Sequence, residues 1–282
     1  MLSTFLQIFI RGAAQATTFI PATVTIARLN FCCIQSFPIY ASLGERSEHL
    51  KDRQLEREIM DDQALQAEQH FDALSGLERL NRWSRSTSIV WPAIHKLARR
   101  NPKHTLEILD IATGGGDIPI GIYQRALKTG VSLRVSGCDL SVRAVEYARQ
   151  RAREAKAAVE FFEFNAVRDV LPKDYDVILS SLFLHHLESE QIEVLLRKMV
   201  QRARHMVLIN DLVRNHLGLS LAHVATRLLT SSKVVHSDGP QSVRAAFTLN
   251  EVRAIAARAD LQNITLVRRW PCRFLLTWTR NA

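Results

Sequence analysis

The sequence predicts an α/β fold in which a mostly parallel, seven-stranded sheet is covered by helices on both faces. Apolar, strand-like runs alternate along the chain with runs of helical spacing, from TLEILDIA at 105–112 to HMVLIND at 205–211. Strands that alternate with helices are typical of βαβ units and of a doubly wound parallel sheet. Capping residues mark several of the same boundaries, which supports this order of elements independently.

Each expected element has its own local signal. Apolar runs of strand length are expected to form the seven strands, at 105–112, 133–140, 159–166, 175–184, 205–211, 264–270 and 272–279. Runs with apolar residues at helical spacing are expected to form helices, at 64–83, 88–100, 118–128, 141–155, 188–204, 219–230 and 251–260. Two of these helices precede the sheet, and the helix at 219–230 lies in an insertion after the fifth strand.

Helix caps support these boundaries. Asp117 comes two residues before Pro119 in an expected first helical turn, and Ser141 precedes the next helix. Gly130 follows a helix end, where a left-handed residue is favoured. Residues 248–251, Thr-Leu-Asn-Glu, match a capping box that opens the last helix.

Composition limits the broad class of the protein. With 282 residues and 47% hydrophobic content, the chain can bury one good-sized core. The formal net charge is +9, but the basic residues are spread along helices without a Lys/Arg block, so the signal for nucleic acid is weak. The four cysteines lack CxxC spacing and the density of a disulfide framework, which favours a reducing cytoplasm and no structural zinc. No metal site and no particular oligomeric state is predicted.

The first 44 residues differ from the rest because they contain no Asp or Glu. An acid-poor transit peptide is one interpretation. Polar residues between Arg11 and Arg28 interrupt the apolar run that a bilayer crossing would need, so no transmembrane segment is predicted. Because a helix-rich sequence starts afresh at Met60, we also consider residues 1–59 a poorly ordered or dispensable leader. The working domain is then 60–282, divided into helices at 60–104, a ligand-binding core at 105–211, a lid insertion at 212–247 and a closing segment at 248–282.

The stretch DIATGGGDIPI, at 110–120, lies between the first strand and the first helix of the expected sheet. Ligands bind at this edge of open α/β sheets, and glycines let the backbone approach them closely. A dinucleotide fingerprint would need a third glycine where Pro119 stands, and the Gly-Lys-Ser/Thr of a P-loop is absent. What remains is an acid followed by small residues at alternating positions: Asp110, Ala112, Gly114 and Gly116.

This pattern resembles the first motif of class I S-adenosylmethionine-dependent methyltransferases, which have a Rossmann-like fold. Ala112 stands where the commonest form of the motif has glycine. The resemblance implies that the loop holds the methionine portion of S-adenosylmethionine, that Asp139 accepts its ribose hydroxyls, and that Asn165, where many relatives have Asp, lies at the adenine edge. The full set of implied cofactor-binding residues is Asp110, Ala112, Thr113, Gly114, Gly116, Asp139, Leu140, Asn165, Ala166 and Ser181.

The fourth expected strand ends in Leu-His-His-Leu, which is similar to many small-molecule methyltransferases. A methyl transfer to a hydroxyl needs a group that removes its proton, and an imidazole suits that task. His185, His186 and Asp211 are therefore the candidate catalytic residues, and His236 is a candidate substrate contact beside Asp238. Each has a structural alternative: one histidine packs or caps a helix, Asp211 binds loop backbone, and residues 238–240 form an ordinary turn.

The acceptor is expected to be small and hydrophobic. The insertion at 212–247 carries an apolar helix that suits a lid, and Trp83 suits an aromatic wall with Arg82 or Arg85 as anionic contacts, although packing alone explains such residues equally well. Residues 180–183 lack the Pro-Pro-aromatic motif of amino-group methylation. The Pro-Cys pair at 271–272 lies far from the strand where a cytosine C5 enzyme needs its cysteine.

The segments LDIATGGGD and LFLHHL resemble those of the group that includes the ubiquinone/menaquinone biosynthesis methyltransferases and the phenolic O-methyltransferases. We therefore expect a cytoplasmic enzyme that O-methylates a phenolic, polyketide or quinone-type compound, a reaction typical of secondary metabolism. The alternatives are C-methylation of a quinone precursor, methylation of RNA, and a non-catalytic subunit that binds the cofactor.

Overall fold

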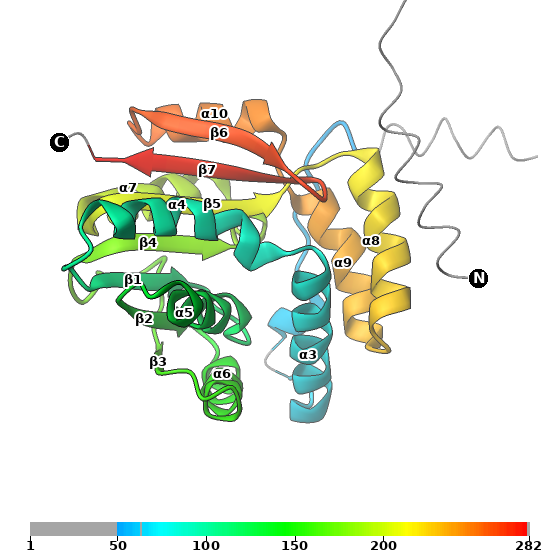
Figure 1. Cartoon of the computed structure of the whole chain (residues 1–282). Helices are drawn as coiled ribbons and strands as arrows, with labels where there is room; N and C mark the ends of the chain where they lie inside the picture. The colour runs from blue at the N-terminus through cyan, green and yellow to red at the C-terminus, as the bar shows by residue number, and fades with distance from the viewer. Residues whose placement is uncertain (1–49, 63, 281–282) are drawn as a thin grey trace, which may run out of the picture. The chain divides into compact units, whose positions relative to one another are not determined.

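The computed structural model describes residues 50–62 and 64–280, and it confirms the expected α/β fold (Figure 1). Seven strands form one sheet in the order β3-β2-β1-β4-β5-β7-β6. They are β1 (Leu106–Ile111), β2 (Leu133–Asp139), β3 (Val159–Glu163), β4 (Tyr175–Ser181), β5 (Ala203–Leu212), β6 (Ile264–Arg269) and β7 (Arg273–Thr279). The first five strands are parallel, whereas β7 runs antiparallel to both of its neighbours.

Helices connect and cover the strands. They are α3 (Ala67–Trp83), α4 (Ser86–Arg100), α5 (Asp117–Thr129), α6 (Val142–Glu154), α7 (Ser189–Arg202), α8 (His216–Leu229), α9 (Lys233–Ala245) and α10 (Leu249–Arg258), with the short 3₁₀ turns η1 (Ile59–Asp61) and η2 (Leu184–His186). No helix within the described ranges combines the length and the apolar run that a bilayer crossing requires.

The core has two layers, because successive residues of a strand point to opposite faces of the sheet. In β4, Ile178 packs with α7 and α10 on one face, while its neighbours Val177 and Leu179 pack with α4 and α5 on the other. Both faces are apolar, which explains why these strands read as continuous hydrophobic runs rather than as alternating ones.

Several predicted caps are confirmed. Ser141 accepts a hydrogen bond from the backbone N–H of Ala144 at 3.2 Å, and Gly130 ends α5 with a left-handed φ of 69°. Thr248 and Glu251 form both halves of the capping box that opens α10. These contacts satisfy backbone groups that a helix end would otherwise leave unpaired.

The insertion after β5 differs in detail from the prediction. It contains two helices, α8 and α9, which pack against α3 beyond the carboxyl ends of the parallel strands (Figure 1). Residues 238–240 are not a turn, since α9 runs through them. Burial of Val235 and Val243 on α9 holds the helix together despite the Pro240 ring.

The segment before Met60 also differs from the predicted leader over the residues that the structure describes. Leu50 is buried, and its carbonyl accepts a hydrogen bond from the buried guanidinium of Arg214 at 3.2 Å. Arg53 donates to the carbonyls of His185 and Ala245. Residues 50–58 are therefore part of the domain, while residues 1–49, with Cys32 and Cys33, lie outside the described residues.

Candidate functional site

One cavity of ≈ 1100 Å³ brings most of the predicted site residues together at the carboxyl ends of the parallel strands. Its lining includes nine of the ten implied cofactor-binding residues, namely Asp110, Ala112, Thr113, Gly114, Asp139, Leu140, Asn165, Ala166 and Ser181. It also includes His185, His186 and Trp83. Gly116 and His236 are not part of this lining.

The glycine loop turns sharply because three alternating residues adopt positive φ angles. The values are 54° for Ala112, 52° for Gly114 and 76° for Gly116. At Gly116 a Cβ atom would lie 2.7 Å from the Phe161 ring, so this position has no room for a side chain. Gly116 therefore contributes to the site by shaping the turn, and Ala112 tolerates a conformation that usually favours glycine.

Asp110 is buried at the end of β1, belongs to the cavity lining and has one unpaired acceptor oxygen. Its Oδ2 accepts a hydrogen bond from the Thr113 hydroxyl at 2.8 Å, whereas Oδ1 has no hydrogen-bond partner among the described residues. Burial raises the pKa of Asp110 well above its usual range. A buried acceptor without a donor is costly, so the position suits a ligand with a cationic or N–H group.

Asp139 ends β2 and ties the glycine loop to α6. Its Oδ2 accepts from the Gly114 N–H at 2.8 Å and its Oδ1 accepts from the Ser141 N–H at 2.9 Å. Burial raises the pKa of this carboxyl group. Each oxygen keeps a second lone pair, and two neighbouring acceptors match the two hydroxyls of a ribose.

Asn165 follows β3 on the neighbouring side of the cavity. Its side-chain oxygen accepts from the Arg168 N–H at 3.1 Å, which fixes the amide at the start of a turn. Ala166 beside it is buried, whereas Leu140 across the cavity mouth is 62% exposed. An apolar surface next to an amide suits the face and edge of a purine.

His185 and Asp211 form a buried pair at the other end of the cavity. The His185 Nδ1 lies 2.7 Å from the Asp211 Oδ1. Burial raises the pKa of Asp211, but the adjacent His185 outweighs this effect and the net pKa is lowered. An ionised carboxylate only accepts hydrogen bonds, so Nδ1 of His185 is the donor in this contact, and Nε2 lies on the side of the ring that faces Glu58.

Asp211 lies behind His185 and does not itself line the cavity. Its oxygens also accept from the backbone N–H groups of Leu184 at 2.7 Å and Leu212 at 2.6 Å. Asp211 therefore binds the loop backbone, as the structural alternative expected, and it also pairs with His185. Asp211 fixes the orientation of the histidine.

His186 is paired with a different carboxylate. Its Nδ1 lies 3.0 Å from the Asp61 Oδ2 in η1. Burial lowers the pKa of His186, but the hydrogen bond to Asp61 and the charges of Glu58 and Asp61 outweigh it and raise this pKa to about 9. His186 therefore carries a positive charge at neutral pH and is a poor base.

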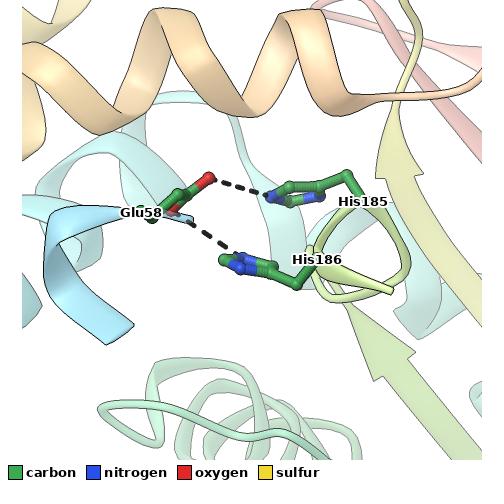
Figure 2. A group of neighbouring side chains, drawn as sticks. All are labelled: Glu58, His185 and His186. Carbon is green, nitrogen blue, oxygen red and sulfur yellow. Dashed lines mark ion pairs between the residues drawn. The ribbon is translucent and has the colours of Figure 1, made fainter. Parts of the chain in front are cut away.

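Glu58 faces both histidines from the segment before η1 (Figure 2). One of its carboxylate oxygens is 3.8 Å from Nε2 of His185, and the other is 3.8 Å from Nε2 of His186. The backbone N–H groups of Ile59 and Met60 donate to Asp238 at 3.0 Å, which anchors this segment to α9. Glu58 and Asp61 were missed by the sequence prediction, although the return of acidic residues after position 44 was a signal that the leader had ended.

The two predicted substrate residues have different positions. Trp83 is 43% exposed at the end of α3 and lines the cavity together with Leu221 and Ala225 of α8. His236 lies outside the lining, and its Nε2 is 2.8 Å from the carbonyl oxygen of Thr230, the residue that follows α8. The predicted contact of His236 with substrate therefore has no support in this geometry.

Comparisons with known proteins agree with the fold. Residues 108–205 match a family model described as a methyltransferase domain. No curated protein matches the chain. The magnesium protoporphyrin IX methyltransferase of Synechocystis PCC 6803, solved with bound S-adenosylhomocysteine, is 17% identical with a TM-score of 0.50, and the alignment covers 86% of this chain and 95% of that one. An O-methyltransferase family 2 protein of Planctomyces limnophilus DSM 3776, solved with apigenin, is 20% identical with a TM-score of 0.53. The alignment covers 86% of this chain and 69% of that one.

The fold and the matched domain define a methyltransferase. Residues 108–205 form a methyltransferase domain, which agrees with the resemblance of the glycine loop and Asp139 to class I S-adenosylmethionine-dependent methyltransferases. The unpaired Asp110 oxygen, the Asp139 carboxylate and the surface beside Asn165 fit the amino, ribose and adenine groups of that cofactor in turn.

Proposed function

We propose that the enzyme transfers the methyl group of S-adenosylmethionine to a hydroxyl oxygen of a small hydrophobic acceptor of the phenolic, polyketide or quinone type. When bound, the cofactor supplies an electrophilic methyl group on a sulfonium. The observation that carries the proposal is the buried His185–Asp211 pair in the wall of the cavity. It provides a base in the same cavity as the glycine loop.

In this proposal His185 removes the acceptor proton through Nε2. Asp211 holds the ring in the tautomer that leaves Nε2 unprotonated, and it stabilises the imidazolium that forms. His186 carries a positive charge and lies beside His185, with ring centroids 4.4 Å apart. Its charge favours the oxygen anion that develops on the acceptor as the proton leaves.

The apolar part of the cavity supports a hydrophobic acceptor. Leu77 and Leu80 of α3 line it together with Leu221 and Ala225 of α8, and the Phe183 ring lies next to that of His186. Apolar walls with a few placed polar groups are typical of small-molecule sites. The solved neighbour from Planctomyces limnophilus holds apigenin, a phenol, which makes phenols a reasonable first panel of acceptors.

The test is turnover with a panel of phenols and hydroquinones. We expect His185→Gln to lower kcat by about 10²–10⁴-fold, which is the usual contribution of a positioned general base, with little change in cofactor affinity. His104→Gln is a matched control, because His104 also pairs with an aspartate, Asp176 at 2.9 Å, but outside this cavity. Unchanged turnover in His185→Gln would remove the assignment.

Product analysis separates the alternative acceptor atoms. An O-methyl product has its new carbon attached to oxygen, and NMR distinguishes this from a ring C-methyl group. A C-methyl product would replace oxygen methylation by the quinone-precursor alternative while leaving the cofactor site unchanged.

A further inference from the structure

The cluster of Glu58, His185 and His186 has the composition and orientation of a metal-binding site (Figure 2). Both histidines use Nδ1 to contact an aspartate, and both direct Nε2 toward the carboxylate of Glu58. One possible ligand atom from each of the three residues lies within 4.8 Å of the others. The three side chains come from two distant segments of the chain that meet only in the folded protein.

Each of the three side chains is held by a neighbour that would form the outer layer of such a site. Asp211 accepts from Nδ1 of His185, and Asp61 accepts from Nδ1 of His186. The Ser242 hydroxyl donates to Oε1 of Glu58 at 2.6 Å. Metal-binding histidines usually donate their second ring N–H to a carboxylate, which fixes the ring and strengthens the ligand.

The distances leave room for an ion between the groups. Each Nε2 lies 3.8 Å from a Glu58 oxygen, which is too long for a hydrogen bond. In a tetrahedral site with bonds of about 2.0–2.1 Å, neighbouring ligand atoms are about 3.4 Å apart. One ligand atom from each residue already lies within 4.8 Å of the others, so a contraction of at most about 1.4 Å, within the freedom of side-chain rotation, would bring the three groups onto one ion.

We propose that Glu58, His185 and His186 together bind one divalent transition-metal ion, with Zn²⁺ as the representative. Binding releases the Nε2 proton that His186 carries in the metal-free protein, because a metal ligand needs the free lone pair. Two imidazoles and one carboxylate suit Zn²⁺ or Fe²⁺, whereas Mg²⁺ and Ca²⁺ prefer oxygen ligands alone. The guanidinium of nearby Arg53 donates to the carbonyls of His185, Leu187 and Ala245, so its N–H groups are engaged by the backbone.

The ion would regulate methyl transfer. A metal bound to Nε2 of His185 occupies the lone pair that the base needs, so the metal-bound enzyme is inactive. This consequence rests on the proposed function, whereas the binding of the ion does not.

The test is calorimetric titration of ZnCl₂ into the full chain after treatment with a chelator. We expect one Zn²⁺ per chain, with affinity lowered at least 10-fold in Glu58→Gln and about 10–100-fold in the outer-layer variant Asp61→Asn. His205→Gln is a matched control, since His205 Nε2 also lies 3.8 Å from a carboxylate oxygen, that of Asp176, near the amino ends of β4 and β5. Thermal unfolding of each variant verifies that it is folded.

The outcomes are distinct. Absence of Zn²⁺ binding in the wild type would overturn the proposal, and so would binding that persists in Glu58→Gln but disappears in His205→Gln. Visible absorption of the Co²⁺-loaded protein gives a second readout, because nitrogen and oxygen ligands around Co²⁺ produce d–d bands that Glu58→Gln should alter. Inhibition by Zn²⁺ that a chelator reverses supports the regulatory role, while activation by Zn²⁺ would overturn it. The titration needs no acceptor, so a failure of the proposed function leaves it interpretable.

Discussion

Replacing Gly116 by alanine should destabilise the protein by steric conflict as well as by backbone strain. The new Cβ atom would lie 2.7 Å from Cζ of Phe161 and 2.9 Å from Cβ of Ala148. Overpacking of this kind costs about 1–3 kcal/mol, and the left-handed φ of 76° adds about 1–2 kcal/mol for any residue with a Cβ. We expect the free energy of unfolding to fall by about 2–5 kcal/mol in all.

Gly130→Ala separates the two contributions. Gly130 has a similar φ of 69°, but no atom of the described chain lies within 4 Å of an ideal Cβ there. Urea unfolding should therefore show a loss of about 1–2 kcal/mol in Gly130→Ala, which is smaller than in Gly116→Ala by the steric part. Equal losses in the two variants would refute the role of Phe161. In Gly116→Ala, shortening the ring with Phe161→Leu should recover part of the loss.

Three further predictions concern the site. Asp139→Ala should abolish binding of S-adenosylmethionine in calorimetry, because it removes both the paired acceptors and the hydrogen bond to the loop; retained affinity would contradict the ribose assignment. In the presence of a chelator, the protein should lose stability as pH rises from 6.5 toward about 9, since folded His186 keeps a proton that the unfolded chain releases. The rise in pKa from 6.5 to about 9 corresponds to at most ~3.4 kcal/mol. Solvent around half-exposed Asp61 reduces this to about 1–3 kcal/mol, and His186→Gln should remove this part of the pH dependence in urea titrations. A chain that starts at Met60 lacks Glu58 and two of the four groups that accept from Arg214, the carbonyls of Leu50 and Lys51, so it should unfold at lower urea concentration than the full chain; equal midpoints would show that residues 50–58 contribute nothing.

The sheet and the cofactor half of the cavity were predictable because their signals are local. Asp110 and the glycines lie in one turn after one strand, and Asp139 ends the next strand. Parallel strands bring their carboxyl ends to the same edge, so this half follows once the strands are placed. Ser141 and Thr248 were equally clear, since a helix cap depends on only the next three residues.

The other half of the cavity could not be predicted, because its contacts join distant segments. Glu58 meets His185 and His186 only after the segment before η1 packs on α9 through Asp238. The difference between the two histidines also depends on tertiary contacts: one meets buried Asp211, and the other meets exposed Asp61. The sequence of two adjacent histidines does not indicate which aspartate each of them will contact. The turn expected at 238–240 was wrong because packing against α3 outweighed the local preference.

The residues that line the cavity come from two parts of the chain. Asp110, Asp139, Asn165 and the histidines all lie within residues 108–205, the range that matches the methyltransferase domain. Glu58, Trp83 and the α8 residues lie before or after that range. Selection can therefore change this part of the cavity wall without altering the segment that carries Asp110 and Asp139. Exchanging the segment before η1 and the helices α8 and α9 between relatives is accordingly a direct way to redirect acceptor choice while cofactor affinity stays constant.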